Sequence, residues 1–376
     1  MKTSPFKFGV VVSDKSFTDR EDELKHLKSN FTNGINTIII SPRRWGKSSL
    51  VEKTVNEIKS EHKNTVFVLI DLFTVNSEKE FYEKYAKQTI KATTSDFKEI
   101  LKEAKNFFKT VIPKFHYSPV PDQDFTLSLD WNKSDNYTED ILELPERIAM
   151  KKKVKIFICI DEFQNLANIN GFEVFEKKLR AHWQKFKNTT FCLYGSKRHM
   201  MKELFNTSSK PFYRFGEIIF LEKISKDNWI NFITKSFSSS GKKISSDAAS
   251  EIADLMQCHP WYVQQLSHYT WENSEKTADK KEVNNALELL LRTNSPLYIR
   301  DCESLSSTQL NFLKAVASKE KNFSSTETMQ KFKLGTSGNV VKIKKILTEN
   351  DIIDLTNKEY IFVDPAFEIW FKKEYL

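Results

Sequence analysis

Residues 40–50 read ISPRRWGKSSL, from Ile40 to Leu50, and they stand between two different periodicities. Before them, INTIIIS is a short β-branched run, which is typical of a strand buried on both faces. After them, SSLVEKTVNEIKS carries apolar residues at helical spacing. A G-K-S string between a strand and a helix matches the end of the G-x-x-x-x-G-K-[ST] pattern. The sequence therefore predicts a phosphate-binding loop at this point.

Ser41 stands where that pattern has its first glycine. Pro42 drives the residue before it into extended geometry, which needs no glycine, so we expect the loop to function. Lys47 would place a charge on the β/γ phosphates, and the Ser48 hydroxyl would hold Mg²⁺. Trp45 fits plain burial, packing over the loop, or a contact with another subunit. The expected nucleotide contacts of the loop are Ser41, Pro42, Arg43, Arg44, Trp45, Gly46, Lys47, Ser48 and Ser49.

A second strand-like run, VKIFICIDE, ends in Asp161 and Glu162. Open α/β sheets bind ligands beyond the carboxyl ends of their strands. Phosphoryl transfer to water needs an acid that supports Mg²⁺ and a group that activates water, which are the roles expected of Asp161 and Glu162. The alternative is a simple acidic helix cap. A third run, FCLYGS, ends in Ser196, which either orients the attacking water or belongs to an ordinary turn.

The order of strand-like and helix-like segments predicts an α/β fold with a parallel sheet. Further strands are expected in NTVFVLID and GEIIF, and a hairpin insertion at about 112–132. Residues 222–295 have only helical patterns. Residues 296–376 predict three helices followed by a hairpin, the outline of a winged helix. The expected domains are thus 1–221, 222–295 and 296–376.

Composition and hydropathy argue against a secreted or membrane-spanning protein. The formal net charge is +8, a mildly basic balance compatible with an anionic partner. The four cysteines lie far apart, as expected of buried thiols in a reducing compartment. The first residues lack the apolar core of a signal peptide, and no run is long enough to span a membrane. We expect a cytoplasmic protein.

A lysine cluster marks the predicted winged helix. Residues 331–345 contain five lysines and no acid, on or beside the third helix, which enters the major groove in helix-turn-helix proteins. Arginine, the usual reader of guanine, is absent from this stretch. The alternatives are phosphate contacts to duplex DNA, a solvated helix face, or a surface for a protein effector. The lysines concerned are Lys331, Lys333, Lys342, Lys344 and Lys345.

Several segments, in order, resemble the archaeal-type P-loop ATPases of the AAA+ and STAND group. The loop SPRRWGKSSL, the strand end IDEFQNL and the strand YGS resemble its phosphate, acidic and sensor elements. FTDREDEL, with Asp19 in place of a glycine, implies that Arg20 lies near the adenine. PFYRF implies that Arg214 senses the phosphate charge. CHPW, with Cys258 in place of a glycine, implies that Pro260 contacts the base or ribose. VDPAFEIW at 363–370 resembles the signature that follows the family's winged helix.

The resemblance implies a nucleotide domain, a helical lid and a winged helix, with ATP or ADP and Mg²⁺ as ligands. Lys47, Glu162, Ser196 and Arg214 are the expected catalytic residues, and Ser48 and Asp161 the metal ligands. We expect an ATPase that acts as a nucleotide-driven switch on a nucleic-acid or protein partner, with a homo-oligomer as a further candidate in the ATP state. Two alternatives stand beside it: a slowly hydrolysing, nucleotide-gated binding module, and a DNA-binding protein with a vestigial nucleotide site.

Overall fold

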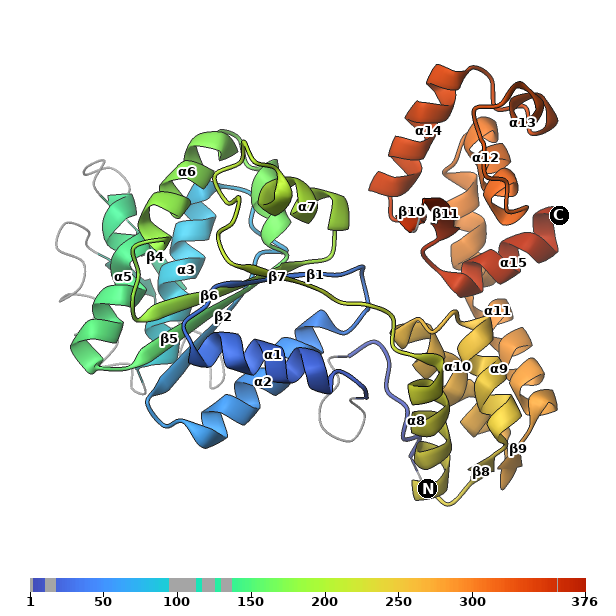
Figure 1. Ribbon diagram of the computed structural model, residues 1–376, viewed down its shortest axis with the longest axis horizontal. Helices are drawn as coiled ribbons and strands as arrows, with labels where there is room; N and C mark the ends of the chain where they lie inside the picture. Colours follow the sequence, from blue (N-terminus) through green and yellow to red (C-terminus); the bar gives the residue numbers. More distant parts are fainter. Residues whose placement is uncertain (1–2, 11–17, 95–112, 117–125, 130–136, 357) are drawn as a thin grey trace. The chain divides into compact units, whose positions relative to one another are not determined.

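A five-stranded parallel sheet lies at the centre of residues 20–222, with strand order β2-β5-β6-β1-β7. The computed structural model describes residues 3–10, 18–94, 113–116, 126–129, 137–356 and 358–376 (Figure 1). The chain divides into an α/β unit, residues 20–222, and a helical unit, residues 1–19 with 223–376. The predicted parallel sheet is confirmed.

The strands of this sheet arise from the apolar runs identified in the sequence. In β5 and β6 nearly every side chain is buried, because each strand has a neighbour on both sides and helices on both faces. The sheet strands are β1 (Thr37–Ile40), β2 (Thr65–Asp71), β5 (Lys155–Asp161), β6 (Thr189–Gly195) and β7 (Glu217–Phe220).

Helices cover both faces of the sheet. Figure 1 shows α1 and α2 on one face and α3, α5 and α6 on the other. Phe31 of α1 packs on Phe67 and Phe157 of the sheet, whereas Trp183 of α6 stacks on Phe191 at 4.2 Å between ring centroids. The helices are α1 (Glu21–Thr32), α2 (Lys47–Glu61), α3 (Glu78–Thr93), α5 (Tyr137–Lys152), the 3-10 helix η2 (Phe163–Asn168), α6 (Phe172–Trp183) and α7 (Arg198–Asn206).

The predicted hairpin insertion is present as an antiparallel pair, β3 (Pro113–His116) and β4 (Thr126–Leu129). Its turn, and the end of the helical pattern predicted over 78–110, lie outside the described residues.

The helical unit begins with a four-helix group and ends with a winged helix. Three helices, α12 to α14, precede the antiparallel β10–β11 hairpin, as predicted. The elements are α8 (Lys226–Ser239), β8 (Lys243–Ile244), α9 (Ser246–Leu255), α10 (Pro260–Asn273), β9 (Thr277–Ala278), α11 (Lys280–Glu303), α12 (Ser307–Ala317), α13 (Thr326–Lys331), α14 (Ser337–Glu349), β10 (Ile353–Thr356), β11 (Glu359–Phe362) and α15 (Pro365–Tyr375).

Two features of the structure bear on the expected domain boundaries, which stay predictions. Phe6 packs against Phe232 and Phe237 of α8, and the first residues group with the helical unit. Helix α11 runs unbroken from Lys280 to Glu303 through the expected boundary at 295/296. The four-helix group and the winged helix therefore share one helix.

The signature VDPAFEIW has a structural explanation. Asp364 caps α15 by accepting a hydrogen bond from the Phe367 backbone, and Pro365 opens the helix. The Trp370 indole donates to the Ser295 hydroxyl of α11 at 3.1 Å, and Tyr298 packs on both aromatic rings. The motif thus connects the last helix to α11.

Among the helices that the structure describes, none has the length and apolar character that a membrane span requires.

Candidate active site

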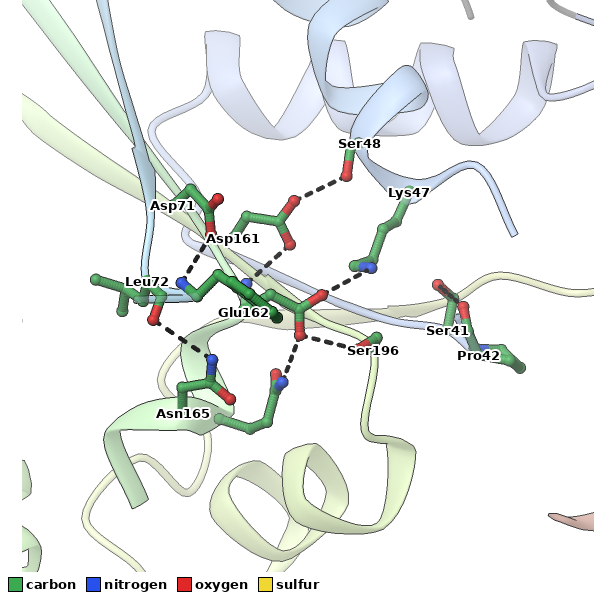
Figure 2. Close-up of polar contacts among 12 residues, drawn as sticks. Ser41, Pro42, Lys47, Ser48, Asp71, Leu72, Asp161, Glu162, Asn165 and Ser196 are labelled. Atoms are coloured by element: carbon green, nitrogen blue, oxygen red, sulfur yellow. Dashed lines mark hydrogen bonds and ion pairs between the residues drawn. The ribbon is translucent and has the colours of Figure 1, made fainter. Parts of the chain in front are cut away.

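The predicted phosphate loop, acidic pair and polar strand end come together at one edge of the sheet. Strands β1, β5 and β6 are parallel, so their carboxyl ends share that edge, and β6 lies between the other two. The loop follows β1, Asp161 and Glu162 end β5, and Ser196 follows β6. Figure 2 shows their side chains converging.

The loop turns at two residues, neither of which is Ser41. Arg44 and Gly46 have φ values of 64° and 86°, in the left-handed region, and α2 begins directly afterwards at Lys47. Ser41 is fully buried, and its backbone is not in the left-handed region. Consecutive turns of this kind aim backbone N–H groups at an anion in front of a helix N-terminus. The geometry thus places the glycine requirement at Gly46 and leaves serine acceptable at position 41.

Arg20 reaches the loop from the start of α1. Its guanidinium is buried, pairs with Glu23 at 2.7 Å and donates to the Trp45 carbonyl at 3.5 Å. Trp45 itself is half-buried, whereas Arg43 and Arg44 are exposed beside the loop. The Arg20 side chain therefore contacts the backbone of the phosphate loop.

Two pairs of side chains form the centre of the site. The Ser48 hydroxyl donates to Asp161 Oδ2 at 2.8 Å, and Lys47 Nζ lies 3.3 Å from Glu162 Oε1 (Figure 2). Lys47 is only 7% exposed. A buried ammonium needs an anionic partner. Here that partner is the Glu162 carboxylate, and a phosphate oxygen could take its place.

The two acids have opposite pKa shifts. Burial raises the pKa of Asp161, and Lys47 only partly offsets this. Burial acts on Glu162 in the same sense, yet its pKa lies below the ordinary value because Lys47, Gln164 and Ser196 together stabilise its charge. Glu162 is therefore held as a carboxylate, the form that can accept a proton.

Gln164 is a residue of this site that the sequence analysis did not identify. Its Nε2 donates to Glu162 Oε2 at 2.5 Å, and the Ser196 hydroxyl donates to the same oxygen at 2.8 Å. Glu162 has φ 52° and opens η2, whose first turn carries Gln164. The sequence did contain a signal for this contact, since a glutamine two residues after a candidate base can turn back toward it.

Asp71, at the end of β2, is the register partner of Asp161, and the sequence analysis gave it no role either.

The site fits a magnesium ion. Mg²⁺ takes oxygen ligands, and in nucleotide sites it uses one or two protein ligands together with phosphate oxygens and water. Ser48 and Asp161 supply a hydroxyl and a carboxylate oxygen that already lie together. Among the described residues no group of three or more His, Cys, Asp or Glu could form an all-protein cage.

Arg214 does not lie at this edge of the sheet, and its expected role as a sensor of the phosphate charge stays a prediction. It precedes β7, and β7 begins where β1 begins, with Glu217 opposite Thr37. The phosphate loop follows the other end of β1. Arg214 is exposed there and lies over the Tyr213 ring. Pro260, the expected base or ribose contact, opens α10 in the helical unit and stays a prediction.

The five lysines of the winged helix have different surroundings. Lys344 is half-buried, with its ammonium 5.1 Å from the Phe323 ring centroid and 5.0 Å from that of Tyr360. Lys331 pairs with Glu320, and Lys345 lies 3.8 Å from Glu349. Lys333 and Lys342 are exposed. Lys344 thus does not belong to an outward-facing set.

Two residues that replace family glycines adopt the backbone conformation that favours glycine. Asp19 has φ 45° and Cys258 has φ 57°. The backbone at both positions therefore has the conformation that a glycine adopts readily, and a residue with a side chain is strained there.

Comparison with known proteins supports this architecture. A family described as an ATPase domain predominantly from Archaea matches residues 17–266, and a probable winged helix domain matches residues 296–373. No curated protein matches the chain significantly.

Solved structures share the fold over nearly the whole chain. The Walker-type ATPase paby2304 of Pyrococcus abyssi has a TM-score of 0.68 at 15% identity, covering 98% of this chain and 99% of that one. The Aeropyrum pernix ORC2 protein, solved as ADPNP-ADP complexes, has a TM-score of 0.59 at 12% identity, covering 98% of each chain. The Aeropyrum pernix ORC1 protein, solved in complex with DNA, has a TM-score of 0.51 at 11% identity, covering 96% of this chain and 94% of that one.

The expected P-loop ATPase fold with a C-terminal winged helix is therefore confirmed. Since the first family match spans more than half of the sequence, the chain belongs to the family of ATPase domains found predominantly in Archaea.

Proposed function

We propose that this protein is a magnesium-dependent ATPase whose nucleotide state switches the activity of its winged helix. The observation that supports it most is the double contact at the sheet edge, Ser48 with Asp161 and Lys47 with Glu162. A vestigial site would have no reason to keep all four groups in reach of one another in a buried setting.

Each residue then has a task. The loop amides and Lys47 bind the β and γ phosphates, while Ser48 and Asp161 hold Mg²⁺. The metal supplies charge neutralisation on the phosphate oxygens. Glu162 accepts a proton as water attacks the γ-phosphorus and the bond to the β–γ bridging oxygen breaks, which yields ADP and phosphate. Ser196 donates to Glu162 and so helps to fix its carboxylate.

The winged helix is proposed as the output of the switch, with duplex DNA as its partner. Lys333, Lys342 and Lys345 are exposed on or beside α14, the third helix of the fold. The Aeropyrum pernix ORC1 structure contains DNA, which makes a nucleic-acid partner reasonable here. A protein effector remains the other outcome of the tests below.

Two substitutions test the enzyme. Lys47→Ala should abolish or strongly weaken ATP binding by calorimetry, because the ammonium that faces the phosphates is lost. Glu162→Gln should keep ATP binding and lower steady-state turnover by about 10²-fold or more, as expected for loss of a general base. Lys59→Ala, an exposed change on the same helix, is the matched control and should alter neither quantity.

Turnover should also require Mg²⁺. Parental ATP affinity in Lys47→Ala would refute the phosphate-loop assignment, and parental turnover in Glu162→Gln would show that another group activates water. Turnover measured with and without duplex DNA distinguishes an efficient ATPase from a slow, partner-gated switch.

A further inference from the structure

Both carboxylate oxygens of Glu162 have polar partners in the structure. One carboxylate oxygen, Oε1, faces Lys47 at 3.3 Å, and the other, Oε2, accepts hydrogen bonds from Gln164 and Ser196. A general base needs one oxygen free to accept a proton and a fixed orientation toward the water. Lys47 is the contact that the phosphates would remove, whereas the two donors to Oε2 are uncharged side chains.

Gln164 is built into this position. Its side chain is 1% exposed, and its Nε2 makes the shorter of the two bonds to Oε2. A Cβ atom at Gly195 would lie 1.8 Å from Gln164 Oε1, so the glycine at the end of β6 makes room for the amide. Buried amides in ordinary cores have both ends satisfied. Here Oε1 has no hydrogen-bond partner among the described residues, and the donor end is spent on Glu162.

We propose that Gln164 is the positioning residue of Glu162, and that the two carboxylate oxygens have separate roles. Oε2 is anchored by Gln164 and Ser196 throughout the cycle. Oε1 is masked by Lys47 until the phosphates of ATP draw the ammonium away, and it is then the oxygen that accepts the proton from water. ATP binding itself therefore exposes the base. This inference rests on the proposed ATPase function.

The reason for a second anchor lies in the backbone at Glu162. Its left-handed conformation places Glu162 at the turn between β5 and η2, and after Lys47 has left, Gln164 and Ser196 are its two hydrogen-bond donors. A single hydroxyl bond allows the carboxylate to pivot, whereas two donors on one oxygen fix its direction. A displacement of about 1 Å at a reacting group can cost about 10²-fold in rate.

The first test compares Gln164→Leu with Gln184→Leu, the same chemical change at an exposed residue. Gln164→Leu should lower kcat by about 10–10²-fold with ATP affinity within about twofold of the parent. The acid limb of the kcat profile should move to higher pH, because the lost hydrogen bond had stabilised the charged carboxylate. Gln184→Leu should change neither. A merely structural Gln164 would alter stability and leave the acid limb where it was.

The second test uses Gly195→Ala, whose methyl group would displace the Gln164 amide. Alone it should lower kcat as Gln164→Ala does. Added to Gln164→Ala it should lower kcat by less than about threefold further, because the amide that it displaces is already absent. Additive losses in this double-mutant cycle would overturn the proposal, as would a parental kcat in Gln164→Leu.

The two proposals fail differently. If Glu162→Gln hydrolyses ATP at the parental rate, the proposed function of Glu162 fails. If Glu162→Gln is impaired while Gln164→Leu retains the parental kcat and acid limb, the ATPase stands and only the role of Gln164 is refuted.

Discussion

Backbone strain at a single residue can be tested by replacing that residue with glycine. Cys258 has a left-handed backbone, and its carbonyl accepts the Trp229 indole N–H at 3.2 Å, a contact that glycine would keep. Cys258→Gly should stabilise the protein by up to about 1 kcal/mol, since relief of left-handed strain exceeds the added unfolded-state entropy.

Ser41→Gly is the opposite case. Ser41 is buried outside the left-handed region and donates its hydroxyl to the Pro42 carbonyl. The change should destabilise the protein by about 0.5–1 kcal/mol and alter ATP affinity little. Urea unfolding and calorimetry measure the two effects. A large gain in ATP affinity would reveal Ser41 as a defect of the loop.

Asp161 carries a cost in stability for its site. Because burial raises the pKa of Asp161, the folded protein disfavours its charged form. The resulting loss of folding stability is absent below the ordinary pKa of aspartate. It grows as the pH rises from there to the raised pKa and is complete above it. Asp161→Asn should therefore raise the thermal midpoint of the nucleotide-free protein at neutral pH, and the gain should shrink on acidification. Asp71→Asn, at the exposed end of β2, is the control. An equal gain at every pH would exclude this origin.

At the scale of the element, Lys344 joins helix α14 to the β10–β11 wing. Burial lowers its pKa, and its ammonium lies over Phe323 and Tyr360, whose rings pack against each other. Lys344→Ala should destabilise the winged helix by about 1 kcal/mol through lost cation–π contacts. Lys342→Ala should stay within about 0.5 kcal/mol of the parent. Faster hydrogen exchange in β10 and β11 for Lys344→Ala alone is the expected readout; equal protection in both variants would contradict it.

At the scale of the whole molecule, the question is whether nucleotide state in residues 20–222 changes DNA binding by the helical unit. Each lysine that neutralises a phosphate contributes about 0.9 to the salt slope of binding. Lys342→Ala with Lys345→Ala should flatten that slope by about two units. Adding Lys344→Ala should not flatten it further, because that side chain is sheltered. Anisotropy titrations with ATP, with ADP and without nucleotide measure it. No binding at low salt in any state would leave a protein effector as the partner.

Much of the architecture follows from contiguous stretches of sequence. The strand, loop and helix around Gly46 and Lys47, the acidic end of β5 and the three helices before the wing were all predicted from local patterns. Such patterns suffice because an apolar run, a glycine turn and a helix N-terminus are each decided within about ten residues.

Tertiary structure alone decided which side chains meet. Ser196 reaches Glu162 because β6 is inserted between β1 and β5, and the same insertion places Gly195 against the Gln164 amide. Arg214 lies at the far edge because β7 runs parallel to β1, a direction that its own sequence does not encode. Lys344 is sheltered by Phe323 and Tyr360, which come from separate segments. Local sequence sets the conformation of a segment, whereas strand order and packing set its neighbours, and the chemistry of a site depends on neighbours.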